Sequence, residues 1–429
     1  MMNDNPLLND IHGRIADYAR EHMDFRFDPA APVVRLHEPS FGAEEVNVAL
    51  DVLLSTRVTM GPKVKQFERE YAAAFGFGHG VMVNSGSSAN LLAIAAVANP
   101  ARKDGLRPGD EVIVPALSWS TTVWPLIQMG LVPVIVDCDP ATFNLDPEQV
   151  ERAIGPRTRG LLIVPVYGNP CDMDALTDIC RRHQLLLMED CCEAMGASYD
   201  GKAVGRFGLF GTFSTYYSHH ITTLEGGLVM TDDFEFAELM RILRAHGWTR
   251  ELENRQPWLD KHPGFDPKFL FVNLGYNLRA TEVQGAMGSV QLPKLAGFIE
   301  TRRANAAAWR KDLARWGAFF DLQQDTPKGI NTCFGFALTL KDDAPFTVAD
   351  MTAHLNRAHI ETRPIICGNI ALQPAMQMFP HRVSGDLKHS TRIMRQGFSF
   401  GNHHHVCPQA RQYVTDAIAS FMQARGLAG

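Results

Sequence analysis

The chain has 429 residues, of which 45% are hydrophobic and 21% charged, so it can bury the core of a large globular protein. Its net charge of −6 gives no basic surface, and we therefore expect no nucleic-acid partner. No apolar run has the length that crosses a bilayer, and the N-terminus has no signal-peptide pattern, so we expect a cytoplasmic protein without membrane contact. The eight cysteines form no CxxC pair and are expected to be reduced thiols.

The first 55 residues are predicted to form a short amphipathic helix and an arm that packs on the body of the protein. From about residue 60 to 235, short apolar runs alternate with helical patterns. Such alternation predicts a mostly parallel sheet covered by helices on both faces, with functional groups beyond the carboxyl ends of the strands. The expected strands lie at 80–86, 111–117, 132–137, 160–168, 185–190, 211–217 and 226–232.

The pattern changes after about residue 235. A helix at 234–248 is followed by a polar, proline-containing stretch at 250–269, and a long helix is then interrupted near Pro293. A further apolar strand and two amphipathic helices indicate a smaller α+β domain at the C-terminus. We therefore predict an α/β protein with three parts, which are an N-terminal arm (1–55), a large domain (56–295) and a small C-terminal domain (296–429).

Gly86, Ser87 and Ser88 stand between the first strand and its helix and form the first candidate site. Backbone N–H groups at a helix start have no partner within the helix, and with the positive end of the helix dipole they can hold a phosphate. A serine-rich helix cap that binds no ligand has the same pattern. The motif alone leaves both interpretations open.

Two further candidates stand at strand ends. Asp190 closes an apolar strand, where a carboxylate is poorly solvated unless it meets a cation such as a protonated pyridine nitrogen; a helix cap or a surface turn would also place an aspartate there. His219 follows Asp190 by 29 residues (219 − 190), just past another strand and before the turn at 225–227. A lone histidine is usually structural, but the nearby phosphate loop and carboxylate favour a catalytic one.

In order and spacing these residues resemble the sugar aminotransferases of the DegT/DnrJ/EryC1/StrS family, over about residues 35 to 429. The family motifs read here as Gly86 to Asn90, Trp119, Glu189-Asp190 with Gly196-Ala197, Ser214, and Gly275-Tyr276-Asn277 with Arg279. The resemblance implies fold-type I of the pyridoxal-phosphate enzymes, with a mostly parallel seven-stranded sheet flanked by helices and a smaller α+β C-terminal domain. It also implies a homodimer with shared active sites.

The same resemblance gives each cofactor-binding residue a role. Pyridoxal phosphate or pyridoxamine phosphate (PLP or PMP) would lie against Trp119, with Asp190 at its pyridinium nitrogen and Glu193 as an acid beside the ring. The groups expected at its phosphate are Gly86, Ser87, Ser88, Ser214 and the partner subunit's Asn277.

One position departs from the family pattern. Where the aminotransferases carry the lysine that bonds to the cofactor, this chain has His219. Imidazole cannot form that bond, but it can take and return a proton near neutral pH. By resemblance, His219 is the catalytic acid–base residue of the branch that removes the 3-hydroxyl of a nucleotide-linked 4-keto-6-deoxy sugar. The product is a 4-keto-3,6-dideoxy sugar, and L-glutamate regenerates PMP. A degenerate protein that only binds cofactor or sugar nucleotide is an alternative.

Cysteine spacing separates two kinds of enzyme within this branch. One kind holds a [2Fe–2S] cluster on four cysteines and draws electrons from a reductase. The resemblance places one ligand at Cys192, but residues 244–277, where the other three would stand, contain no cysteine. We therefore predict no iron–sulfur cluster and interpret Cys192 as a packing residue. Segments such as 361–369 resemble the cluster-free kind, with GDP the favoured nucleotide; a reductase-coupled CDP-sugar enzyme is the alternative.

His403, His404 and His405 form a run that invites a metal interpretation. Consecutive side chains diverge, and no carboxylate or cysteine lies at ligand spacing, so we predict no metal site. The favoured interpretation is a polar loop that lines the pocket and contacts the sugar or the nucleotide.

Overall fold

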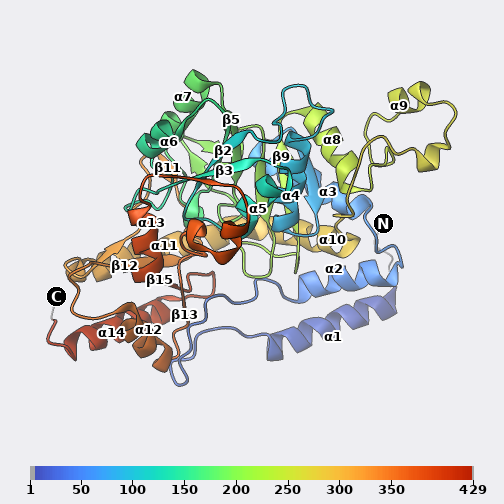
Figure 1. The fold of residues 1–429 in the computed structure, drawn as a ribbon. Helices are drawn as coiled ribbons and strands as arrows, with labels where there is room; N and C mark the ends of the chain where they lie inside the picture. The colour runs from blue at the N-terminus through green and yellow to red at the C-terminus, as the bar shows by residue number, and fades with distance from the viewer. Residues whose placement is uncertain (1–4, 428–429) are drawn as a thin grey trace.

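The computed structural model describes residues 5–427, and its central feature is an eight-stranded sheet with helices on both faces (Figure 1). The order across the sheet is β1 (His79–Val83), β9 (Gly227–Thr231), β8 (Gly211–Ser214), β5 (Leu186–Asp190), β4 (Thr158–Ile163), β2 (Glu111–Pro115), β3 (Val132–Val136) and β14 (Arg382–Ser384). Strand β9 runs antiparallel to both neighbours, and the other pairs are parallel. The predicted α/β fold with a mostly parallel sheet is confirmed.

The seven predicted strands are all present, and β14 is an eighth that the sequence analysis missed. It has only three residues and pairs in parallel with β3 at the edge of the sheet. So short a strand has no recognisable period of its own, and its formation depends on the chain returning from the C-terminal part to the large sheet.

The two faces of the sheet bury alternate residues of the same strands. Val112 and Val114 pack toward α4 (Gly86–Val97), α5 (Ser120–Gln128) and α8 (Phe234–Arg244). Ile113, between them, packs toward α6 (Pro147–Ala153) and α7 (Met173–His183). Because successive side chains of a strand point to opposite faces and both faces are covered, the central positions of these strands are apolar. This burial explains the continuous apolar runs in the sequence.

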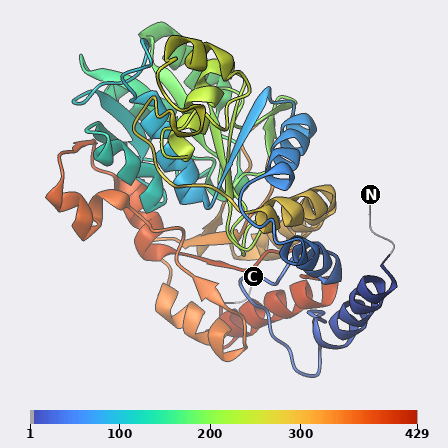
Figure 2. The same ribbon diagram turned by 90° about the vertical axis from the view of Figure 1, so that its right-hand side faces the viewer.

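Four helices join the N-terminal segment to the body. Helix α1 (Pro6–His22) has no buried residue and lies beside α2 (Ala43–Leu54) at one edge of the molecule (Figures 1 and 2). Helix α2 packs against α10 (Glu282–Gln291), which also packs against α3 (Pro62–Phe75). The buried Glu282 carboxylate accepts hydrogen bonds from backbone N–H groups at the start of α3, at 2.8 to 3.0 Å. These bonds satisfy donors that a helix start leaves free.

The C-terminal part has its own antiparallel sheet of four strands. Their order is β10 (Phe320–Leu322), β12 (Phe336–Leu340), β15 (Gly397–Phe400) and β13 (Thr362–Arg363). Helices α11 (Leu295–Leu313), α12 (Val348–Arg357) and α14 (Pro408–Gln423) cover it. Its core is aromatic: the rings of Trp309 and Phe400 lie edge to face at 4.9 Å. This part therefore has a core separate from that of the large sheet.

Smaller elements complete the fold. Strands β6 (Ser198–Tyr199), β7 (Lys202–Ala203) and β11 (Gly329–Ile330) form a three-stranded sheet, and α13 (Lys388–Gln396) precedes β15. Helix α9 (Gln256–Lys261) lies on an excursion that projects from the body in Figure 1. Among the helices of residues 5–427, none is both long and apolar enough to cross a membrane.

Candidate active site

A cavity of about 590 Å³ lies beyond the carboxyl ends of the parallel strands. The start of α4 and the ends of β5 and β8 form one wall, and residues of the C-terminal part form the opposite wall. Among the predicted site residues, those that line it are Gly86, Ser87, Ser88, Trp119, Asp190, Glu193, Ser214 and His219. The parallel topology brings these residues together because each follows a strand that ends at the same edge.

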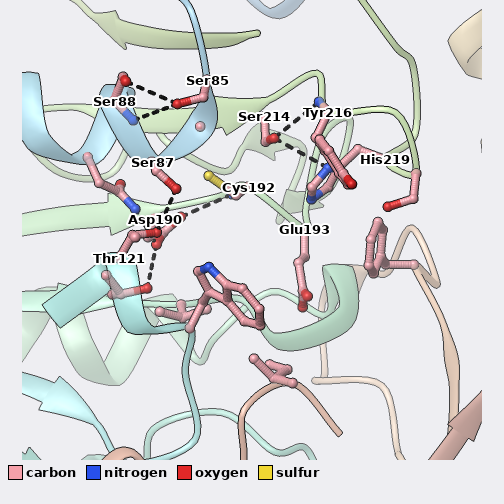
Figure 3. A pocket seen from close by; sticks show the side chains of 18 of the residues that line it. Ser85, Ser87, Ser88, Thr121, Asp190, Cys192, Glu193, Ser214, Tyr216 and His219 are labelled. Atoms are coloured by element: carbon pink, nitrogen blue, oxygen red, sulfur yellow. Dashed lines mark hydrogen bonds between the residues drawn. The ribbon is translucent and has the colours of Figure 1, made fainter. Parts of the chain in front are cut away.

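The start of α4 provides an anion-binding cradle. Ser85 caps the helix, with its Oγ accepting the Ser88 N–H at 3.1 Å, so the N–H groups of Gly86 and Ser87 face the cavity end of the helix. A Cβ on Gly86 would lie 2.6 Å from the Cβ of Ser214, so the close approach of α4 to β8 requires glycine here. The Ser87 hydroxyl lies 3.0 Å from that of Thr121 (Figure 3). This arrangement of donors fits a phosphate group.

Asp190 is a buried carboxylate that neutral groups hold in place. Its oxygens accept hydrogen bonds from Asn90 Nδ2 at 2.8 Å, Thr122 Oγ1 at 2.7 Å and the Cys192 N–H at 3.2 Å. No ion pair of Asp190 is found within the described residues, although the side chain is only 4% exposed and lines the cavity. A buried charge calls for a cation, and a protonated pyridine nitrogen fits this requirement.

His219 lies on the loop after β8 with one ring nitrogen anchored. Its Nδ1 is 3.3 Å from Ser214 Oγ, and its ring stacks on Phe334 with centroids 5.1 Å apart (Figure 3). Desolvation, together with the positive charges of Arg302 and Arg363, lowers the pKa of His219 to about 3. The imidazole is therefore neutral at physiological pH. Because Ser214 takes up Nδ1, Nε2 is the nitrogen that can move a proton.

The pKa of Glu193 is shifted in the opposite direction to that of His219. Burial raises the pKa of its carboxyl to about 7, which the charge of Arg363 partly opposes. One oxygen accepts the Tyr167 N–H at 3.1 Å, and the side chain points away from Ser214 and His219 (Figure 3). Tyr167 holds this N–H in place with a left-handed backbone (φ 57°, ψ 26°), a strained conformation for an aromatic residue. The site thus pairs an unprotonated base with a carboxyl that titrates near neutral pH.

The cavity has residues that sequence reasoning did not identify. Ser85, Thr121 and Thr122 support the phosphate cradle and Asp190, and so does Asn90, which the family motif includes but for which the sequence predicted no role. The opposite wall adds Phe334, Arg363 and Ile366, which lie more than 100 residues beyond His219 in the chain. Arg363 and Ile366 stand in the stretch at 361–369 that resembles the cluster-free enzymes, and this resemblance is the one sequence signal for this wall.

Asn277 is the predicted residue that does not reach the cavity of its own chain. Its side chain is exposed, and its Oδ1 accepts the Arg279 Nε–H at 3.0 Å. Its assignment to the cavity of a partner subunit therefore stays a prediction. Trp119 does line the cavity, and it is 51% exposed at the start of α5.

The histidine run does not line this cavity, and its expected contact with the sugar or the nucleotide stays a prediction. His403 Nε2 lies 3.2 Å from the Arg35 carbonyl and His405 Nε2 lies 3.3 Å from the Pro39 carbonyl, beside a separate small cavity. The sequence did not predict that the arm at 24–39 packs against the loop at 403–405. In residues 5–427, no group of three or more His, Cys, Asp or Glu side chains is arranged to hold a metal.

Cys192 lines the cavity, close to the space beside Gly86. Burial and the charge of Asp190 raise the pKa of its thiol well above the ordinary value. The thiol is therefore protonated at physiological pH.

Family profiles, related sequences and solved structures all place this chain near the same group of proteins. The profile of the DegT/DnrJ/EryC1/StrS aminotransferase family matches residues 39–419. GDP-4-keto-6-deoxy-D-mannose 3-dehydratase of Yersinia pseudotuberculosis is 43% identical over 371 residues, which are 86% of this chain and 93% of that protein. A solved mutant of GDP-4-keto-6-deoxymannose-3-dehydratase with bound GDP-perosamine is 38% identical, with a TM-score of 0.85 over 90% of this chain and all of that one.

A second solved structure of GDP-4-keto-6-deoxymannose-3-dehydratase, with a trapped PLP-glutamate geminal diamine, is 37% identical. Its TM-score is 0.83, over 90% of this chain and 99% of that one. The family resemblance drawn from the motifs is thus confirmed over most of the sequence. This chain belongs to the DegT/DnrJ/EryC1/StrS aminotransferase family.

Proposed function

We propose that this protein is a PMP-dependent 3-dehydratase, a carbon–oxygen lyase that acts on a nucleotide-linked 4-keto-6-deoxy sugar. The observation that carries this proposal is His219 at the cavity, on the loop where an aminotransferase of this family has its lysine. A side chain that cannot bond to the cofactor leaves the cofactor amine free for the keto sugar.

We assign the cofactor to the wall built by the large sheet. The N–H groups at the start of α4 and the Ser214 hydroxyl would hold its phosphate, and Asp190 would face its pyridine nitrogen. Trp119 would cover the ring. Bound PMP supplies an amine that condenses with a ketone and a protonated ring that accepts electrons.

His219 is the residue that we assign to proton transfer. Ser214 fixes the imidazole through Nδ1, and Phe334 fixes the plane of the ring, so the direction of Nε2 is also fixed. A neutral imidazole can take a proton from carbon and return it to the departing 3-hydroxyl as water. The residue thus carries one proton between two atoms of the reacting molecule.

The relatives support the choice of substrate and donor. The two solved dehydratases carry GDP-perosamine and a PLP-glutamate adduct. We therefore propose a GDP-linked 4-keto-6-deoxyhexose as substrate and L-glutamate as the donor that restores PMP. Glutamate leaves as its 2-keto acid and supplies the two electrons, the nitrogen leaves as ammonia, and the sugar loses one oxygen atom. Neither a reductase nor an iron–sulfur cluster is needed for this balance.

We also propose that the active unit is a homodimer. The exposed Asn277 lies outside the cavity of its own chain, and a second subunit could bring it to the phosphate. Asn277→Ala should then weaken PLP binding about tenfold without unfolding the chain, as loss of one hydrogen bond to a charged group predicts. Unchanged PLP affinity in this variant would remove Asn277 from the site.

The test of the proposed function uses the purified protein with PLP, glutamate and a panel of GDP-, CDP- and dTDP-linked 4-keto-6-deoxy sugars, without a reductase. We expect mass spectrometry to detect a product that lacks one oxygen, formed fastest from the GDP sugar. A product that carries an amine at C4 would identify an aminotransferase and overturn the proposal. A requirement for added reductase would identify the reductase-coupled enzyme instead.

A further inference from the structure

Arg363 is the one arginine or lysine among the described residues that line the active-site cavity. Asp190, Glu193 and Glu225 line the same space, so the cavity is otherwise acidic. Within residues 5–427 the guanidinium of Arg363 has no hydrogen bond or ion pair, whereas its backbone pairs with β15 and its carbonyl accepts the Ser399 hydroxyl at 3.5 Å. A guanidinium in the lining of a cavity, without a carboxylate partner, is suited to an anionic ligand.

The fold fixes where this charge stands. Arg363 is the second residue of β13, which pairs with Ser399 of β15, so its backbone is held by the sheet of the C-terminal part. Its charge contributes to the lowered pKa of His219 and opposes the raised pKa of Glu193, so the guanidinium lies near both groups. It therefore faces the reacting atoms from the wall opposite the phosphate cradle.

Two anions enter this site under the proposed function, on which the inference rests: the amino-acid donor and the sugar nucleotide. The α-carboxylate of the donor is bonded to the carbon that loses its proton, and that carbon has to lie within reach of His219 Nε2. The diphosphate of a sugar nucleotide is separated from the reacting carbons by the sugar ring. A cation close to His219 therefore matches the α-carboxylate better than the diphosphate.

We propose that Arg363 binds the α-carboxylate of the amino-acid donor, and so selects α-amino acids for the half-reaction that converts PLP to PMP. A guanidinium can hold a carboxylate with two parallel N–H···O bonds, which also orients the α-carbon. In that half-reaction the amine passes from the donor to PLP, and the donor leaves as its 2-keto acid. His219 removes the α-proton, and the sugar nucleotide takes no part.

The experiment separates the two half-reactions in Arg363→Gln. Conversion of PLP to PMP by glutamate is followed by absorbance, and dehydration is followed as a single turnover of enzyme preloaded with PMP. We expect the glutamate concentration for half-maximal rate to rise at least about 100-fold, as loss of a buried charged hydrogen bond predicts, with the single turnover changed less than about threefold. Arg363→Lys should recover part of the loss because it keeps the charge.

A donor without an α-carboxylate gives a readout that a merely structural role would not change. Wild-type enzyme should use glutamate far better than 4-aminobutyrate, and Arg363→Gln should lose most of that preference. The control is Arg35→Gln, since Arg35 pairs with Glu38 at 2.5 Å outside this cavity. PLP titration and circular dichroism check that each variant folds.

Each outcome bears on the inference. If Arg363→Gln slowed both half-reactions equally, or slowed only the single turnover of dehydration, Arg363 would be assigned to the sugar nucleotide and the proposal would be overturned. Unchanged glutamate dependence would also overturn it. If wild-type enzyme forms PMP from glutamate but dehydrates no sugar, the proposed function fails while the role of Arg363 remains measurable in the first half-reaction.

Discussion

The two walls of the active-site cavity are built in different ways. The wall on the large sheet takes its groups from short segments that directly follow strands, such as Asp190 and His219. The opposite wall is formed by Phe334, Arg363 and Ile366, which reach the cavity only because the C-terminal part packs against the large sheet. We assign cofactor binding and proton transfer to the first wall, and contact with substrates to Arg363 of the second. Changes in the first wall should therefore impair every half-reaction, and a change at Arg363 should impair one.

The largest expected effect is that of His219→Asn. Loss of the acid–base group should lower the single-turnover dehydration rate by about 10³-fold or more, since general acid–base catalysis contributes about 10²–10⁴. PMP binding should change little, because the phosphate cradle and Asp190 remain. Rapid-quench kinetics on the PMP-loaded enzyme measures the rate. His12→Asn, which removes a bond to Asp51 at 2.9 Å far from the cavity, is the control. Full activity in His219→Asn would remove the base assignment.

Asp190→Asn should have the next largest effect. The change keeps the shape of the side chain but removes the charge opposite the pyridine nitrogen, so we expect PLP affinity to fall about 100-fold, the cost of losing a buried charged partner. Absorbance titration with PLP measures it. Asp24→Asn, at an exposed pair with Arg26, should leave the affinity unchanged. Equal affinities in the two variants would contradict the position assigned to the ring nitrogen.

Gly86→Ala tests the phosphate cradle. The added Cβ would meet Ser214 and displace the start of α4, so we expect about tenfold weaker PLP binding, equivalent to about one hydrogen bond to a charged group. Competition by inorganic phosphate should weaken in parallel. Gly297→Ala is the matched control, because a Cβ there meets nothing within 4 Å. If both substitutions left PLP and phosphate binding intact, the phosphate would lie elsewhere.

The smallest expected effect is on the pH dependence of the dehydration rate, which we assign to Glu193. Its pKa is raised to about 7, so the carboxyl is protonated below that pH and ionised above it, whereas His219 stays neutral from about pH 4 upward. The dehydration rate should therefore be level between about pH 5 and 6 and fall as pH rises through 7. Glu193→Gln cannot ionise and should remove this fall while changing the rate at pH 6 less than about threefold. An unchanged pH profile would show that another group titrates.

The wall on the large sheet was predictable from sequence for a physical reason. Parallel strands end at one edge, so Gly86, Asp190, Ser214 and His219 could be placed together once the strands were found. The residues that position them were not predictable. Asn90 and Thr122 each donate to Asp190, but an asparagine or threonine in a helix has many other uses.

The opposite wall could not be predicted because it depends on packing between segments far apart in the chain. Arg363 is the last residue of a two-residue strand, which has no period that a pattern can detect, and β14 is nearly as short. Asn277 shows the same limit in another form, since the role proposed for it depends on a second chain. Local motifs thus identify the groups that hold the cofactor, and tertiary contacts decide which substrates meet it.

One measurement tests the central claim most directly, namely that His219 enables dehydration without an external reductase. PMP-loaded enzyme is freed of metal with a chelator, its iron content is determined, and one turnover with a GDP-linked 4-keto-6-deoxy sugar is followed by mass spectrometry in the absence of oxygen and of any reductase. We predict a product that lacks one oxygen, released with one equivalent of ammonia, from iron-free protein. Recovery of a C4-amino sugar, or of unchanged substrate until a reductase is added, would contradict the account.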